Sequence, residues 1–209
     1  MTPANAAWFD RPATKLRALG FDTDFAFGIR LKSQQRLDQM QVTSSTGVSQ
    51  SLLQNGGLVD VQTRVIAAGT RLVRFGSGVL VPNVASGEWW LDWDAYKIVE
   101  NYADSSGVSI PVAVRKLCCV PLEWNQMTLI IEARAIQPLL AYEGFGAPAT
   151  ARGGKDHVEP ATANRLGLKQ LFIPGLSDPD LRRDALLITG YGFLRHELST
   201  AGYFPCEMP

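Results

Sequence analysis

Three apolar stretches of the chain predict strands, and the first of them alternates apolar and polar residues with a period of two. These are residues 58–66 (LVDVQTRVI), 71–75 (RLVRF) and 127–136 (MTLIIEARAI). Successive side chains of a β-strand point to opposite faces of its sheet, so each stretch predicts a strand. In the second stretch, Arg71 and Arg74 are three residues apart and should therefore lie on opposite faces.

A helical period follows these strands. Ala95, Ile98, Val99 and Tyr102 occupy positions i, i+3, i+4 and i+7, which form one face of an α-helix. Asp92 precedes them and is a suitable N-cap.

Other helices are expected at residues 13–19, in the polar segment 32–41 and after Asp178. Late strands are predicted at residues 168–173, before Pro174 and Gly175, and at residues 186–194.

The remaining segments lack a clear period. Residues 42–50 are rich in Ser and Thr and predict a loop, and the Gly-, Pro- and Ala-rich residues 138–167 predict a long mobile one. Residues 108–122 (VSIPVAVRKLCCVPL) are β-branched and apolar, which favours edge or interrupted strands. Trp89 and Trp90 are expected in a loop before the Asp92 cap.

The order of predicted elements indicates a mixed α+β fold, because strands and helices do not alternate regularly. Residues 1–55 are interpreted as a small N-terminal extension, a candidate docking or delivery segment. Residues 58–209 are interpreted as the catalytic domain.

Composition and charge bear on two classes of function, nucleic-acid binding and membrane spanning. The 209 residues include 46% hydrophobic and 19% charged residues, with 20 Lys and Arg against 20 Asp and Glu. Zero net charge gives no strong signal for nucleic-acid binding. No apolar segment has the length of a membrane span, so we expect a soluble, cytoplasmic protein, or one delivered to a target cell's cytosol without a signal peptide.

The cysteines and histidines do not suggest a metal site. Cys118, Cys119 and Cys206 form no C-x-x-C pair, and His157 and His196 lie far apart in sequence. We expect reduced thiols that act as small apolar side chains. The sequence also lacks a phosphate-binding loop, a dinucleotide-binding glycine motif and a nucleophile elbow.

Four separate motifs remain as candidates for chemistry. They are GTRLVRF (69–75), SGEWWLDWDAY (86–96), AYEGFGAP (141–148) and GLKQLFIPG (167–175). In order and spacing they resemble the ADP-ribosyltransferase-like domains of bacterial toxins, including NAD-hydrolysing members, over roughly residues 64–176. The resemblance implies a mixed split sheet with short helices, and NAD as the substrate.

The resemblance also implies roles for individual residues. Arg74 matches the family arginine and would bind the pyrophosphate, with Gly76 beside it. Trp89 or Trp90 would stack on nicotinamide, and Gln170 would bond a ribose hydroxyl. The motifs depart from the family at Val73, where an aromatic residue is common, and at Leu91, where Ser or Thr is common.

The position of Gln170 bears on the reaction. Transferases that modify protein side chains commonly carry a glutamate there, so the resemblance favours NAD hydrolysis by a toxin or effector. Glu132, Glu143 and Glu159 are candidates for a carboxylate supplied from elsewhere.

Two alternatives remain open. One is a mono-ADP-ribosyltransferase that modifies a protein or nucleic acid. The other is a non-catalytic assembly or interaction protein of a phage or secretion system. For the toxin interpretation, an immunity or neutralising protein is an expected partner.

Overall fold

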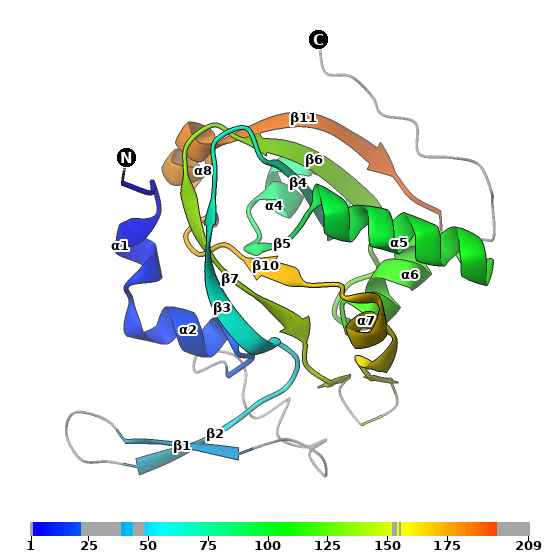
Figure 1. The fold of residues 1–209 in the computed structure, drawn as a ribbon, viewed down its shortest axis with the longest axis horizontal. Coiled ribbons are helices and arrows are strands. Elements are labelled where there is room, and N and C mark those ends of the chain that lie inside the picture. Colours follow the sequence, from blue (N-terminus) through cyan, green and yellow to red (C-terminus); the bar gives the residue numbers. More distant parts are fainter. Residues whose placement is uncertain (1, 22–38, 44–48, 152–153, 155, 196–209) are drawn as a thin grey trace.

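A seven-stranded antiparallel sheet forms the centre of the computed structural model (Figure 1), which describes residues 2–21, 39–43, 49–151, 154 and 156–195. The strand order is β11-β6-β4-β5-β10-β7-β3. The strands are β3 (Leu58–Ile66), β4 (Arg71–Gly76), β5 (Trp89–Asp92), β6 (Leu129–Ala135), β7 (Leu139–Gly146), β10 (Gln170–Phe172) and β11 (Leu186–Phe193). The predicted mixed α+β class is confirmed.

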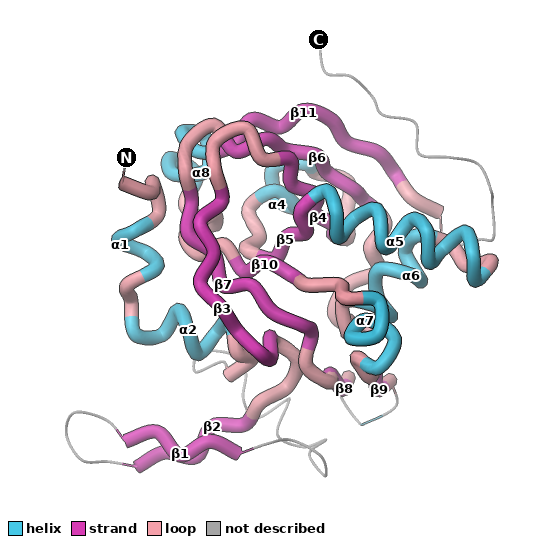
Figure 2. Tube along the Cα trace, in the orientation of Figure 1, coloured by secondary structure: helices cyan, strands magenta, loops and turns pink. Residues whose placement is uncertain are grey.

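Short elements surround the sheet. Strands β1 (Gln39–Thr43) and β2 (Ser49–Leu53) pair with each other, as do β8 (Ala149–Thr150) and β9 (His157–Val158). The helices are α1 (Ala6–Phe9), α2 (Pro12–Ala18), α4 (Val81–Ala85), α5 (Trp93–Ser106), α6 (Ile110–Leu117), α7 (Ala161–Leu166) and α8 (Pro179–Ala185). Figure 2 shows α5, α6 and α7 at one side of the sheet and α1 and α2 at the other.

Strand β5 joins the two halves of the sheet. Its residues Trp89 and Trp90 pair with β10, whereas Leu91 and Asp92 pair with β4. The strand is only four residues long. The relative position of the two halves therefore depends on a short stretch of backbone.

Helix α5 forms as its sequence predicts. The Asp92 side chain accepts a hydrogen bond from the Ala95 backbone N–H at 2.8 Å, and Gly107 ends the helix in the left-handed conformation with φ 62°. Ala95 and Val99 are buried against β4 and β5 in a cluster with Val73. Helix α8 is likewise capped by Asp178, as expected.

The prediction of strands for residues 108–122 is wrong, because Ile110–Leu117 form helix α6. Pro111 lies in the first turn of this helix, where its missing N–H costs no hydrogen bond. Val114 and Leu117 are buried against α5 and the sheet. Packing at a helical period outweighs the β-branched composition that favoured a strand.

The prediction of a long mobile loop for residues 138–167 is also wrong. This segment contains β7, which pairs with both β3 and β10, and the shorter elements β8, β9 and α7. Glycine composition was misleading here. Gly144 lies so close to β3 that a Cβ atom would stand 2.5 Å from the Val59 carbonyl oxygen.

Two smaller predictions also change. Trp89 and Trp90 belong to strand β5 rather than to a loop. Residues 39–43 and 49–53 form strands where part of a polar helix and part of a loop were expected, while residues 22–38 and 44–48 lie outside the described residues. None of the described helices is both long and apolar enough to cross a membrane.

The first helices pack directly on the sheet. Ala18 is buried in a cluster with Leu58, Tyr142 and Phe172. The division of the chain at residue 55 stays a prediction. These contacts nevertheless give residues 2–21 a part in the core.

Asn5 provides a test of this packing. Its amide nitrogen donates to the carbonyls of Leu140 and Pro174, at 2.8 and 3.0 Å, and its oxygen accepts from the Leu140 N–H at 2.7 Å. Asn5→Ala should lower the free energy of unfolding by about 2–4 kcal/mol, because it leaves buried backbone groups unpaired. Urea denaturation measures this, with exposed Lys15→Ala as the control. Equal stability of the two variants would contradict a structural role for the segment.

Candidate functional site

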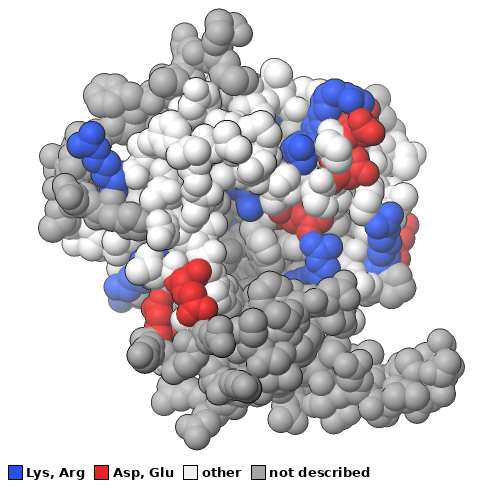
Figure 3. All heavy atoms as spheres, turned by 180° about the vertical axis from the view of Figure 1, so that it is seen from behind, with Lys and Arg blue, Asp and Glu red and all other residues white. Residues whose placement is uncertain are grey.

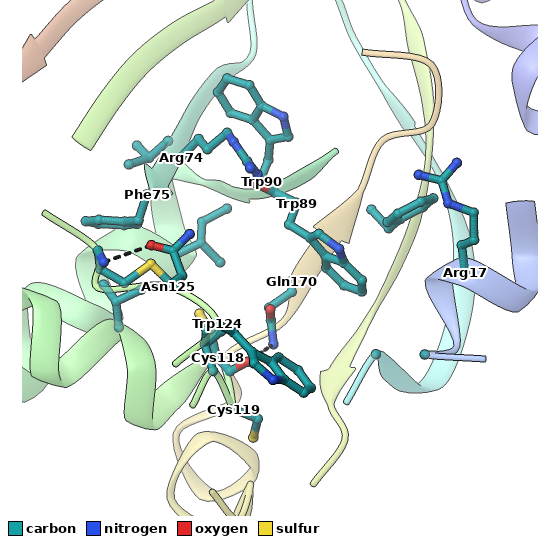
Figure 4. Close-up of a pocket in the computed structure, with 18 of the residues that line it drawn as sticks. Arg17, Arg74, Phe75, Trp89, Trp90, Cys118, Cys119, Trp124, Asn125 and Gln170 are labelled. Carbon is teal, nitrogen blue, oxygen red and sulfur yellow. Dashed lines mark hydrogen bonds between the residues drawn. The ribbon is translucent and has the colours of Figure 1, made fainter. Parts of the chain in front are cut away.

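A cavity of about 330 Å³ lies where β4, β5 and β10 meet the loop after α6 and helix α2. Four of the residues singled out in the sequence line it: Arg74, Trp89, Trp90 and Gln170. Figure 4 shows these side chains in place. The fifth, Gly76, is not among the lining residues, and a Cβ atom there would stand 2.5 Å from the Val84 side chain.

Neighbouring positions on β5 separate the two tryptophans. Trp90 is buried in a core cluster with Leu72 and Leu171, and its indole N–H donates to the Gly87 carbonyl at 2.9 Å. Trp89 faces the other way, with its ring edge-on to Phe172 at 5.0 Å between centroids. In Figure 4 the Trp89 indole points toward Gln170, whereas the Trp90 indole points away from it. Of the two, Trp89 is therefore the one placed to meet a ligand.

Gln170 presents an acceptor to the cavity. Its amide nitrogen donates to the Cys118 carbonyl at 3.2 Å. A carbonyl can only accept, so this bond fixes which end of the amide faces Cys118. No described residue donates to the amide oxygen, which Figure 4 shows on the side toward Trp89. The side chain is 6% exposed and held in a close approach to Gly146.

Arg71 and Arg74 lie on opposite faces of β4, as their spacing predicted. The Arg71 guanidinium lies 3.4 Å from the centroid of the Trp93 ring and pairs with Glu132 at 3.2 Å.

The Arg74 guanidinium lies on the side of α4. Its Nε donates to the Val84 carbonyl and its Nη1 donates to the Trp89 carbonyl. Gly87 allows this position, since a Cβ atom there would overlap the guanidinium. Burial lowers the pKa of Arg74 to about 10, an effect that the nearby Glu88 carboxylate partly offsets. The role of Arg74 as a pyrophosphate ligand stays a prediction. Its Nε and Nη1 already donate to two backbone carbonyls.

Three residues of this region were not singled out in the sequence. Glu88 is buried at 6% exposure and forms an ion pair with Arg17 of α2. Trp124, from the loop after α6, lines the cavity next to Gly56. Glu88 directly precedes the tryptophan pair, which was the one available signal. Arg17 and Trp124 lie in segments without a motif.

Asn125 holds the loop that carries Trp124. Its side-chain oxygen accepts from the Ser77 hydroxyl at 2.7 Å and from the Met127 N–H at 2.8 Å. The loop is thereby joined to the end of β4. In Figure 4 the indoles of Trp89 and Trp124 lie on either side of the Gln170 amide.

The other candidate carboxylates lie elsewhere. Glu132 pairs with Arg71, Glu143 binds Arg64 at 2.6 Å, and Glu159 pairs with His157. No Asp or Glu lines the cavity among the residues that the structure describes. Within the same residues, no three His, Cys, Asp or Glu side chains gather to hold a metal ion.

The charged side chains on the face shown in Figure 3 are mixed. Lysines and arginines lie beside aspartates and glutamates, and most of the described surface is uncharged. The described part of this face presents no large area of a single sign.

Cys118 and Cys119 are buried free thiols, as expected, although they follow a helix instead of lying in a strand. Both line the cavity. Burial raises the pKa of Cys118 far above its usual value and that of Cys119 to about 12, with the Glu159 charge adding to the latter shift. The thiols are therefore protonated at neutral pH and are poor nucleophiles. Cys206 and His196 lie outside the described residues.

The chain was compared with protein-family models, curated proteins and solved structures. No protein-family model matches the chain, and no curated protein matches it. Among solved structures, the chain is similar to a chain of "Rhs1-CT in complex with cognate immunity protein RhsI1", with a TM-score of 0.36 and 9% identity. That match covers 72% of this chain and 84% of the other.

The state of the thiols can be tested in a Cys206→Ser variant. At pH 8 a thiol with a pKa near 12 is ionised to about 0.01%, against roughly a quarter for an unperturbed cysteine. Iodoacetamide should therefore modify Cys119 at least tenfold more slowly in the native protein than in urea, as followed by mass spectrometry. Rapid modification of the native protein would show an accessible thiolate and contradict this environment.

Proposed function

We propose that the cavity binds NAD and that the protein hydrolyses the bond between nicotinamide and ribose. The observation that carries the proposal is the convergence of Trp89 and Gln170, from different strands, on one cavity. The resemblance of four sequence motifs to NAD-consuming toxin domains supplies the substrate class.

The aromatic side chains suit a planar ring. Trp89 and Trp124 are both partly exposed and both line the cavity. Nicotinamide in NAD is a cationic ring, and indole faces attract cations as well as flat aromatic groups. In the proposed complex the ring lies against Trp89, and Trp124 forms another part of the same cavity wall.

The reaction needs little acid–base help. The bond from the nicotinamide nitrogen to ribose C1′ breaks, and its electron pair stays on the nitrogen, so the leaving group becomes neutral. Positive charge develops on the ribose as in glycoside hydrolysis. Water then bonds to C1′ and releases a proton to solvent, which gives ADP-ribose and nicotinamide.

Gln170 would orient the ribose. Its amide oxygen can accept a hydrogen bond from a ribose hydroxyl and hold C1′ in position as charge develops. An amide cannot accept the proton of an attacking group at neutral pH. With no carboxylate among the described lining residues, nothing there activates a protein acceptor. This favours water as the acceptor and hydrolysis over transfer.

Arg74 would act through Trp89 in this proposal. Its hydrogen bonds to the Val84 and Trp89 carbonyls hold the start of β5, and with it the indole. A cell that makes such an enzyme would lose its own NAD, so the proposal also includes a neutralising protein as a partner.

Release of nicotinamide from NAD tests the proposal. Wild-type protein should release it, and Gln170→Met should lower kcat about 100-fold, since methionine keeps the volume but offers no comparable acceptor. Thermal melting checks that the variant stays folded. The control is Gln137→Met, because Gln137 is exposed and does not line the cavity.

Two results would contradict the proposal. One is no release of nicotinamide by the wild type. The other is equal activity of Gln170→Met and Gln137→Met, which would remove Gln170 from the reaction.

A further inference from the structure

Arg17 brings a charge to the cavity from the N-terminal part of the chain. It lies near the end of α2, and its side chain is 45% exposed while still lining the cavity. Its guanidinium carbon stands 5.5 Å from the centroid of the Phe172 ring. Figure 4 shows Arg17 and Arg74 on opposite sides of Trp89 and Gln170.

Glu88 fixes the position of Arg17. One carboxylate oxygen of Glu88 accepts from the Gly175 N–H at 2.7 Å, and the other pairs with Nη2 of Arg17. Glu88 is almost fully buried, so its charge requires partners of this kind. The ion pair therefore holds Arg17 at the cavity in one orientation.

The charges of this region do not balance. Among the described residues, Arg17 and Arg74 together face one carboxylate, that of Glu88. Arg74 already donates to two carbonyls. In contrast, Nε and Nη1 of Arg17 make no hydrogen bond to any described residue. One guanidinium edge whose N–H groups have no acceptor among the described residues thus lies at the cavity.

We propose that Arg17, positioned by Glu88, binds the pyrophosphate of the dinucleotide. A planar guanidinium suits two phosphate oxygens, and its weak hydration favours such pairs. A cavity of about 330 Å³ is small among ligand pockets. It accommodates the nicotinamide and ribose end and leaves the phosphates at the partly exposed edge, where Arg17 lies.

This inference rests on the proposed function, and it changes two interpretations. The pyrophosphate ligand becomes Arg17 instead of Arg74. The first 21 residues then supply a specificity-determining residue and are not only a docking segment.

The test compares substrates with and without phosphate. Arg17→Met keeps the packing on Phe172 and removes the charge. We expect it to raise the ratio of KM for NAD to KM for nicotinamide riboside at least tenfold, because only NAD carries the pyrophosphate. An unchanged ratio would overturn the assignment. Arg11→Met is the control, since Arg11 lies over Trp8 and does not line the cavity.

A second variant addresses folding. Arg17→Met removes the ion-pair partner of Glu88 and leaves it the Gly175 N–H. The double variant Arg17→Met with Glu88→Gln removes both charges and should give the same ratio. A double variant that restores the wild-type ratio would show that Arg17 only balances Glu88, which also overturns the assignment.

A binding measurement separates this inference from the proposed function. Titration calorimetry with inorganic pyrophosphate should show binding to the wild type and at least tenfold weaker binding to Arg17→Met. If pyrophosphate binds in this way but NAD is not cleaved, the proposed reaction fails and the anion site remains. If wild type and variant bind pyrophosphate equally, or neither binds it, the anion site fails.

Discussion

The arrangement of the molecule depends on how the partly buried guanidinium of Arg74 holds strand β5. This four-residue strand is the only element pairing with both β4 and β10, so it joins the two halves of the described sheet. Arg74 donates to the carbonyls of Val84 and Trp89 and thereby ties α4 to the start of β5. Gly87 leaves the space for this contact. The cavity lies next to these hydrogen bonds, and both Arg74 and Trp89 line it.

Glu88 holds the charged side chain of Arg17 in position at the cavity. A buried carboxylate is costly unless it is paired, and here Arg17 and the Gly175 N–H satisfy it. The pair crosses from the N-terminal helices to the start of β5. The pair thereby adds Arg17 to a cavity wall that also contains Trp89, Trp124 and Gln170, residues distant from it in sequence. Each is supported by a backbone contact or a neighbouring side chain instead of by one continuous motif.

Local patterns predicted some features of the fold and not others. The alternation around Arg71 and Arg74 placed them on opposite faces correctly, and the Asp92 cap located α5. Composition failed where tertiary packing decides: β-branched residues 110–117 became a helix, and glycines of 138–146 fitted a central strand.

The sequence likewise predicted only some residues of the candidate site. The resemblance to the toxin domains predicted that Trp89 or Trp90 and Gln170 belong to one site, and these residues line the cavity. It could not separate Trp89 from Trp90, because that depends on β5 being a strand. Arg17 and Trp124 were not predictable, since no local pattern indicates which distant segments meet across the sheet.

The most direct test of the central claim is a crystal structure with an NAD analogue whose nicotinamide is joined to ribose by a carbon–carbon bond, which cannot be hydrolysed. The account predicts the ring against Trp89, a ribose hydroxyl about 3 Å from the Gln170 amide oxygen, and the pyrophosphate on Arg17. An analogue bound outside this cavity would contradict it, as would one bound within it but without contact to Trp89 and Gln170.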